Sequence, residues 1–276
     1  MTLEWPHAPA RAAVEDVART PRLLVALDFD GTLAPLVDDP MNARATPAAV
    51  EVVARLAAVP GTTVAFVSGR SMRDLRVIAE HSDDSPVYLA GSHGVEFWTP
   101  GEGEAPSDDD EAAHRLRDEL RHAAEAATAH LPGVWIEPKT FGFGVPTRLA
   151  SAEDERSAFE IVDHLVRARA PHWRRRTGHN IVEYSFRHEG KDSAVAVLRE
   201  RLAATAVIFA GDDVTDEDAL RALRPADLGI RVGVGETAAR VRVADTAALV
   251  EVLTAVAAAR ASTPAPPRTP RGETRE

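Results

Sequence analysis

Two acidic side chains stand two residues apart at the end of an apolar run. Asp28 and Asp30 follow Leu23–Leu27, and Gly31 and Thr32 come directly after them. Side chains at this spacing on an extended chain point to one side, and open α/β sheets bind ligands at the carboxyl ends of their strands. Like charges about 4 Å apart repel by roughly 4 kcal/mol at an effective dielectric of 20, so the pair favours a proton or a divalent cation. Gly31 permits a tight turn, and Thr32 can donate to a phosphate oxygen. A solvated acidic turn is the alternative interpretation, which the buried run disfavours.

A second acidic cluster follows another apolar run near the C-terminus. Asp212, Asp213 and Asp216 come shortly after Ala206–Ala210, and two more acids follow them. Carboxylate oxygens are hard ligands that suit Mg²⁺ better than zinc. Acids also favour the first turn of a helix, which explains the last two members of the cluster better than it explains Asp212. The two clusters together predict a magnesium site.

Cationic and hydroxyl groups occur where a phosphate would need them. Ser68, Gly69 and Arg70 end the apolar run Thr63–Val67, and Lys191 lies shortly before the second acidic cluster. A single lysine or arginine is usually only solvated. Their occurrence at strand ends, beside two acidic clusters, predicts a phosphate-binding site.

Four apolar runs read as strands that are buried on both faces. They are Leu23–Leu27, Thr63–Val67, Val87–Ala90 and Ala206–Ala210, with Leu228–Val232 as a further candidate. Helical patterns lie between or after them, over Thr46–Ala58, Ser71–His81, Asp192–Leu202, Thr215–Leu223 and Thr246–Arg260. Alternation of buried strands with helices is typical of a parallel sheet covered on both faces. We therefore predict an α/β fold with a Rossmann-like parallel-sheet core.

The middle of the chain has a different pattern. After an acidic linker over Gly101–Asp110, the order of elements is helix, hairpin, helix, hairpin, which predicts a small α+β insertion. The segments are Glu111–His130, Val134–Lys139, Phe141–Arg148, Ala152–Ala168, His172–Thr177 and Ile181–Phe186. The expected division is an N-terminal extension (1–20), a catalytic core (21–107 and 188–260), an inserted cap (108–187) and a disordered tail (261–276) rich in proline.

Composition excludes several classes of function. The chain has 276 residues, a formal net charge of -11 and no cysteine. The negative balance argues against sequence-independent binding to nucleic acid or anionic membrane, and the lack of cysteine excludes a thiol nucleophile. Met1–Pro21 has no apolar signal core, and no run approaches the roughly 20 apolar residues of a membrane span. We expect a cytoplasmic protein with a small-molecule substrate.

These motifs resemble a known family. Asp28 to Thr32, Ser68 to Arg70, Lys191 and Gly211 to Asp216 are similar, in order, to the four motifs of the haloacid dehalogenase superfamily. Gly91-Ser92-His93-Gly94 and Gly211-Asp212-Asp213 with Thr215 to Asp218 narrow the resemblance to its trehalose-6-phosphate phosphatases. The resemblance runs from about Leu23 to about Arg260 and implies the same core fold with an inserted cap.

The resemblance implies a mechanism. Asp28 would attack phosphorus, and Asp30 would protonate the leaving oxygen and then activate water. Ser68, Thr32 and Lys191 would hold the phosphoryl oxygens. Mg²⁺ would be bound by Asp28, the backbone carbonyl of Asp30 and Asp212, with Asp213 or Asp216 in support. The remaining substrate contacts would come from Gly69, Arg70 and His93 in the core and from Glu137, Lys139, Arg148 and Glu183 in the cap.

The chain departs from the family pattern in the cap. Pro146-Thr147 precedes Arg148 where His-Tyr is usual, Ser185-Phe186 replaces Arg-Pro, and Asp192 replaces glycine. These positions lie where the sugar would be recognised, and exposed polar alternation is the alternative interpretation of Glu137 and Lys139. The expected substrate is trehalose 6-phosphate, supplied by a trehalose-phosphate synthase-like glycosyltransferase. The alternatives are a related pseudo-disaccharide phosphate, a phosphomutase on the same scaffold, or a binding protein without catalysis.

Overall fold

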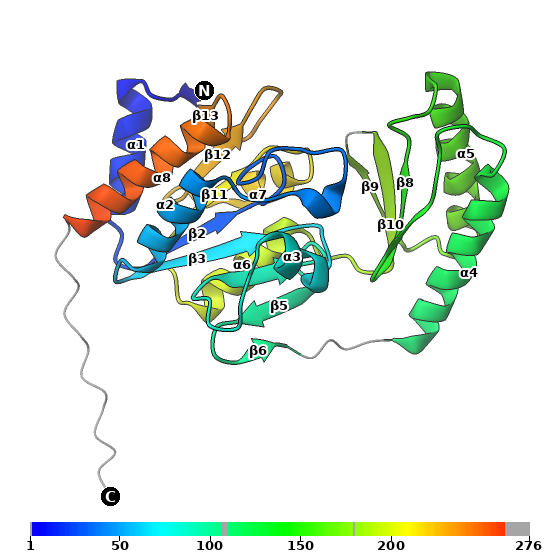
Figure 1. Ribbon diagram of the computed structural model, residues 1–276, viewed down its shortest axis with the longest axis horizontal. Helices are drawn as coiled ribbons and strands as arrows, with labels where there is room; N and C mark the ends of the chain where they lie inside the picture. Colours follow the sequence, from blue (N-terminus) through cyan, green and yellow to red (C-terminus); the bar gives the residue numbers. More distant parts are fainter. Residues whose placement is uncertain (1, 106–109, 179, 263–276) are drawn as a thin grey trace, which may run out of the picture.

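The computed structural model describes residues 2–105, 110–178 and 180–262, and within them the larger of two sheets has nine strands (Figure 1). From edge to edge these are β1 (Leu3–Glu4), β13 (Val241–Val243), β12 (Leu228–Val232), β11 (Ala206–Gly211), β2 (Leu23–Leu27), β3 (Thr62–Val67), β4 (Tyr88–Gly91), β5 (Glu96–Thr99) and β6 (Gly103–Glu104). The pairs from β1 to β4 are parallel, and the last two pairs are antiparallel. The predicted α/β fold class is confirmed.

Helices cover both faces of this sheet because β2 is apolar on both sides. The helices of the larger unit are α1 (Ala8–Ala18), α2 (Pro47–Ala57), α3 (Met72–Ile78), α6 (Lys191–Arg201), α7 (Asp216–Ala222) and α8 (Thr246–Ala261). Leu23, Val25 and Leu27 share one core cluster with residues of α1, α2, α3 and α8. Leu24 and Ala26 point the other way, into a cluster with α6 and α7. This strand is therefore fixed from both faces, and so is the loop that follows it.

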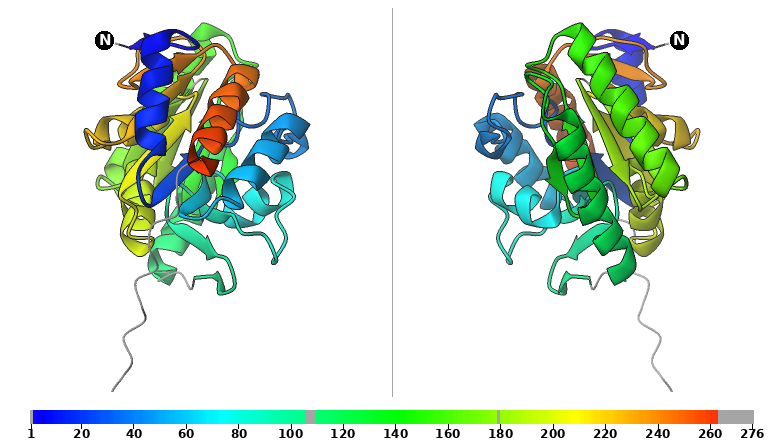
Figure 2. Two further views of the ribbon diagram at one scale, coloured as in Figure 1. Left: turned by 90° about the vertical axis from the view of Figure 1, so that its left-hand side faces the viewer. Right: turned by 90° about the vertical axis from the view of Figure 1, so that its right-hand side faces the viewer.

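The first twenty residues form part of the core. Strand β1 pairs in parallel with β13, and α8 packs between α1 and α2 at the end of the molecule away from the smaller sheet (Figure 2, left). Ala10, Val14 and Val17 of α1 are buried in the main core cluster. The stretch that sequence patterns set apart as an N-terminal extension is thus integrated into the larger unit.

The segment predicted as an acidic linker is partly structured. β5 and β6 extend the sheet as antiparallel edge strands, so the prediction of a linker from Gly101 is wrong at its start, whereas residues 106–109 lie outside the described part. β6 has only two residues and no apolar alternation, and pairing with β5 holds it in place. Such a strand depends on its neighbour and not on its own sequence.

Residues 110–187 form the smaller unit, which we call the cap (Figure 1). Its antiparallel sheet has the order β7 (Glu137–Lys139), β8 (Gly142–Pro146), β10 (Ile181–Ser185), β9 (Arg174–Gly178). Helices α4 (Glu111–Thr128) and α5 (Ala152–Arg169) cover the side of this sheet that faces away from the larger unit. The predicted order of elements is confirmed, with bounds that move by a few residues.

Alternation along the cap strands gives the sheet two different faces. Phe143, Val145, Val182 and Tyr184 pack into the cluster with α4 and α5. The residues between them, which include Glu183, lie on the opposite face, toward the core. The cap therefore presents polar side chains to the carboxyl end of the larger sheet.

The C-terminal part of the chain enters the core through α8. This helix ends at Ala261, and residues 263–276, for which disorder was predicted, lie outside the described part. Among the residues that the structure describes, no helix is long and apolar enough to cross a membrane.

Candidate active site

A buried lysine joins two of the predicted catalytic acids. Lys191 Nζ donates to Asp28 Oδ1 at 2.7 Å and to Asp216 Oδ1 at 2.6 Å, and all three side chains are at most 6% exposed. Asp28 directly follows β2, Asp216 begins α7 and Lys191 begins α6, so three core elements fix this triad. A buried ion pair is sustained only when further groups complete its hydrogen bonds, and here the second carboxylate does so.

The electrostatics of the triad leave negative charge in excess. Burial raises the pKa of Asp28 well above its usual range, against the attraction of Lys191, and the charges of Asp216 and Asp212 raise it further. Burial and the charge of Asp216 raise the pKa of Asp212 to about 6. Burial acts to lower the pKa of Lys191, but Asp216 and Asp28 outweigh it and the pKa is raised. Three carboxylates with one ammonium group favour a further cation.

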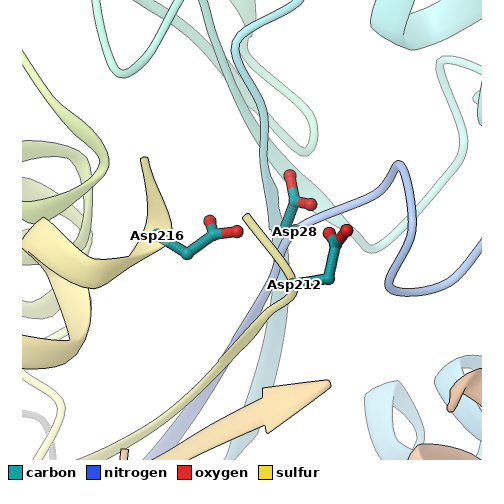
Figure 3. Close-up of side chains that lie close together, drawn as sticks. All are labelled: Asp28, Asp212 and Asp216. Carbon is teal, nitrogen blue, oxygen red and sulfur yellow. The ribbon is translucent and has the colours of Figure 1, made fainter. Parts of the chain in front are cut away.

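The three carboxylates have the arrangement of a cation site (Figure 3). One oxygen each from Asp28, Asp212 and Asp216 lies within 4.8 Å of the others. The Thr32 hydroxyl donates to Asp28 Oδ2 at 3.4 Å and to Asp212 Oδ1 at 3.2 Å. An all-oxygen donor set of this kind fits Mg²⁺ and does not suit zinc or copper.

The sequence offered Asp213 and Asp216 as supporting ligands of the metal, and the structure places Asp216 with Asp28 and Asp212. Asp213 stays outside this group, and its backbone N–H donates to Asp216 Oδ2 at 2.9 Å. The approach of the two acidic loops also requires a glycine. Gly31 has a φ of 74°, and a Cβ placed on it would lie 2.1 Å from Asp212 Oδ2.

The Asp30 side chain points to a different partner. Arg70 Nε donates to Asp30 Oδ2 and Arg70 Nη2 donates to Oδ1, both at 2.7 Å. Burial acts to lower the pKa of Arg70, but the hydrogen bond and charge of Asp30 outweigh it and the pKa is raised. This bidentate pair holds both oxygens of Asp30. Arg70, predicted to contact substrate, here contacts the predicted general acid.

The second predicted phosphate loop is close to the cap. Ser68 is buried, and its hydroxyl accepts the backbone N–H of Arg70 at 3.2 Å. A Cβ on Gly69 would lie 2.7 Å from the ring of His93, so a larger residue there would have to displace this ring. His93 Nε2 lies 3.3 Å from Glu183 Oε2 of the cap. The His93 ring therefore connects the core loops to the cap face.

Two acids and a lysine converge on the inner face of the cap. Lys139 Nζ lies 2.7 Å from Glu137 Oε1 and 3.3 Å from Glu183 Oε1. Burial acts to lower the pKa of Lys139, but the two glutamates raise it to about 12. Burial acts to raise the pKa of Glu183, but Lys139 and His93 outweigh it and the pKa is lowered. Lys139 and Glu183 therefore stay charged at neutral pH, and the side chains of this triad can bind vicinal hydroxyls by bidentate hydrogen bonds.

Arg148 is the predicted substrate contact that the structure does not place with the others. It is exposed beyond the end of β8, and its guanidinium lies 5.3 Å from the centre of the Trp135 ring. Within the described residues it makes no hydrogen bond or ion pair with the cap triad. Strand β8 ends at Pro146, and Arg148 lies in the turn that leads to α5, a boundary that a sequence motif does not show.

Sequence reasoning did not predict the ion pair that joins cap and core, although it left open that one of the arginines Arg174 to Arg176 faces the cleft. Arg174 Nη2 of the cap lies 3.0 Å from Asp218 Oδ2 at the start of α7. The crevice between the units, lined by residues that include Gly69, His93, Lys139, Arg176 and Glu183, has a volume of about 30 Å³. This volume holds little more than a water molecule, so this part of the crevice is too narrow for a sugar ring in this structure. A further signal was available: the chain has only two lysines, and both lie in this site.

The fold and site define a class of protein. The chain has the architecture of the haloacid dehalogenase-like hydrolases, as in the solved B. subtilis protein of that description, which is 14% identical with a TM-score of 0.58 and covers 84% of this chain and 98% of its own. The C-terminal domain of C. albicans trehalose-6-phosphate phosphatase is 19% identical, with a TM-score of 0.77 over 94% of this chain and 98% of that one. At these identities the likeness concerns the fold alone.

Residues 26–251 match the family model described as trehalose-phosphatase, and the chain belongs to this family. A trehalose-phosphate phosphatase of Mycolicibacterium paratuberculosis is 35% identical over 216 residues, which are 72% of this chain and 51% of the relative. A bifunctional trehalose-6-phosphate synthase/phosphatase of Thermoproteus tenax is 32% identical over 82% of this chain and 31% of the relative. The chain thus spans about half the length, or less, of these curated relatives.

Proposed function

We propose that the chain is a Mg²⁺-dependent phosphatase that hydrolyses trehalose 6-phosphate to trehalose and phosphate. The observation that carries the proposal is the position of the buried Asp28–Lys191–Asp216 triad beneath a cap face that bears Glu137, Lys139 and Glu183. Membership of the trehalose-phosphatase family supports the same substrate. We further propose residues 21–107 and 188–260, together with the N-terminal segment that packs on them, as the catalytic core and 108–187 as the part that selects the substrate.

The chemical steps are assigned to two carboxylates. Asp28 attacks phosphorus as the P–O bond to the sugar breaks, and Asp30 gives its proton to the leaving sugar oxygen. Asp30 then takes a proton from water, which attacks the aspartyl-phosphate and releases phosphate with Asp28 restored. Lys191, Ser68 and Thr32 hold the phosphoryl oxygens during both steps.

A divalent cation fits the carboxylates next to this nucleophile. Mg²⁺ would be held by Asp28, Asp212 and Asp216 together with the backbone carbonyl of Asp30, and when bound it neutralises charge on the phosphoryl oxygens. Asp30 must also leave Arg70 before it can donate a proton, because the guanidinium holds both of its oxygens. Movement of the cap during substrate binding is the step at which we place this release.

Removal of the metal is expected to stop the reaction. Phosphate release from trehalose 6-phosphate should fall to background with excess EDTA and return with Mg²⁺, because the excess of carboxylates otherwise repels a phosphate dianion. Full activity in EDTA would reject the requirement for a metal.

The substrate is tested separately, by comparing initial rates over trehalose 6-phosphate, glucose 6-phosphate and pseudo-disaccharide phosphates. A flat profile of rates would reject the disaccharide assignment.

The cap triad should determine the KM for the disaccharide. Glu183→Gln is expected to raise KM for trehalose 6-phosphate by about 10- to 100-fold, the equivalent of the roughly 1.5–3 kcal/mol that a hydrogen bond to a charged group contributes. The same variant should keep its kcat and KM for 4-nitrophenyl phosphate, which lacks sugar hydroxyls. The exposed Glu153→Gln on α5 is the matched control and should leave both substrates unchanged. If Glu183→Gln raised the KM for both substrates equally, recognition of the sugar by Glu183 would be contradicted.

The remaining proposals concern the surroundings of the reaction. A trehalose-phosphate synthase-like glycosyltransferase is proposed as the source of the substrate, and the bifunctional relative supports this link. A cytoplasmic location follows from the same assignment. Both stay predictions.

A further inference from the structure

The inner face of the cap carries an arginine that the proposed mechanism does not use. β9 contains three consecutive arginines, and strand alternation sends them to different faces. Arg175 lies on the outer face, where its Nε donates to Asp163 Oδ1 at 2.7 Å. Arg174 and Arg176 lie on the inner face, and Arg176 stands directly across from Glu183 in the sheet.

Arg176 differs from the other cations around the cleft in having no acidic partner. The paired ones are Lys139 with Glu137 and Glu183, Arg70 with Asp30, Arg174 with Asp218, Arg187 with Glu189, and Lys191 with Asp28 and Asp216. Within residues 2–105, 110–178 and 180–262, no carboxylate lies at ion-pair distance from Arg176. Its Nη2 donates instead to the backbone carbonyl of Glu189, a neutral acceptor.

The charge of Arg176 is compensated only by carboxylates that do not contact it. Burial and the nearby charge of Arg174 lower the pKa of Arg176 below its usual range, and the charges of Glu183, Asp218 and Asp192 offset this only in part. A half-buried guanidinium without a counter-ion is costly unless an anion can join it. Among the described residues, Arg176 is therefore a cation beside the cleft that feels nearby carboxylates but forms no direct ion pair with one.

The position of Arg176 connects the sugar face with the phosphate end of the cleft. It lines the crevice together with Gly69, which follows Ser68, and with His93. Its acceptor Glu189 precedes Lys191 by two residues. Burial lowers the pKa of His93, and the charges of Arg176 and Lys191 both lower it further, so the three side chains share one electrostatic environment.

We propose that Arg176 is a further substrate-binding residue, which brings the positive charge of the cap to the phosphate group of the substrate. The only formal charge of a sugar phosphate is on its phosphate, and Lys191 is already shared between Asp28 and Asp216. Exchange of the Glu189 carbonyl for a phosphate oxygen replaces a neutral acceptor with a charged one, which gives a stronger hydrogen bond. The inference rests on the proposed function only in that the substrate is a phosphate monoester.

Two other roles make different predictions. If Arg176 recognises sugar hydroxyls together with Glu183, its loss affects only the disaccharide phosphate. If Arg176 merely holds the segment between β10 and α6 through the carbonyl of Glu189, its loss lowers the melting temperature and leaves phosphate binding unchanged. A phosphate contact affects every phosphate monoester, and also free phosphate.

The test uses Arg176→Gln, which keeps hydrogen-bonding capacity without charge, and Arg176→Lys, which restores the charge. Arg175→Gln on the outer face of the same strand is the matched control. Three quantities are measured in the presence of Mg²⁺: KM and kcat with trehalose 6-phosphate, the same with 4-nitrophenyl phosphate, and the Kd of inorganic phosphate by calorimetry. The melting temperature of each variant is measured alongside.

For Arg176→Gln we expect both KM values and the Kd of phosphate to rise by about tenfold or more, the scale of one charge-assisted hydrogen bond, with partial recovery in Arg176→Lys. Arg175→Gln should change the melting temperature alone. A KM effect confined to trehalose 6-phosphate, or an unchanged Kd of phosphate with a lower melting temperature, overturns the proposal. If the wild type fails to hydrolyse trehalose 6-phosphate, the proposed function fails, while the phosphate Kd still decides the role of Arg176.

Discussion

Asp28→Asn is expected to lower kcat for phosphate release from trehalose 6-phosphate by more than about 10⁴-fold, within the range seen when an enzyme nucleophile is removed. The amide has the size of the carboxylate but cannot form an acyl phosphate that water hydrolyses. The fold should survive the change. Burial raises the pKa of the Asp28 carboxyl, so its ionised form is costly in the core, and asparagine removes that cost. Lys191 keeps Asp216 as a partner, at 2.6 Å.

The measurement is steady-state phosphate release at saturating substrate and Mg²⁺, together with circular dichroism to verify the fold. Asp38→Asn is the matched control, because Asp38 is exposed in the loop that follows the same strand. It should retain full activity. An Asp28→Asn variant with wild-type kcat would remove the proposed nucleophile, and with it the aspartyl-phosphate.

The core of the fold could be predicted because its signals are local. The run Leu23–Leu27 is apolar at every position and is buried at every position, and the acids that follow it can only lie at the end of that strand. The same holds for Ala206–Gly211, which pairs directly with it. Two adjacent buried strands with acids at their carboxyl ends determine the meeting of Asp28 and Asp212. The local pattern contains the strands and the acids at their ends, whereas the pairing of the two strands is a property of the fold.

The less predictable contacts join segments that are distant in the chain. The pairing of Arg70 with Asp30 spans 40 residues, and that of Arg174 with Asp218 spans 44. Neither pair has a spacing signal, because the side chains come from different loops or different units. The choice of Asp216 over Asp213 depends on the turn into α7 and on the lysine from α6. These features follow from packing and not from the local pattern.

The two lysines of the chain show how position changes the expected energetics. Lys139 lies on the cap face with its side chain 31% exposed, whereas the Lys191 side chain is 4% exposed. A partly exposed ion pair contributes little to stability, because water screens it and its side chains lose entropy. A buried pair that loses one partner leaves an uncompensated charge. The same substitution at the two sites should therefore have very different effects.

Lys191→Met is expected to lower the free energy of unfolding by about 3–5 kcal/mol and the melting temperature by roughly 10 °C, in addition to abolishing turnover. Methionine has a similar volume but no charge, so Asp28 and Asp216 would remain buried without a counter-ion. Lys139→Met is the matched control and should cost much less stability. Chemical denaturation at neutral pH without divalent ions measures both variants.

Mg²⁺ provides the sharper test of this interpretation. If the loss in Lys191→Met comes from uncompensated carboxylates, a divalent cation bound by Asp28, Asp212 and Asp216 should restore part of it. Added Mg²⁺ should then raise the melting temperature of this variant more than that of the wild type or of Lys139→Met, because a ligand stabilises the state that binds it. If Mg²⁺ raised the melting temperature of all three proteins equally, the ammonium group of Lys191 would not be what balances the charge of the carboxylates that bind the metal. Unchanged stability of Lys191→Met without Mg²⁺ would show that the buried triad contributes no net stability, and the role of Lys191 would then be confined to the phosphate.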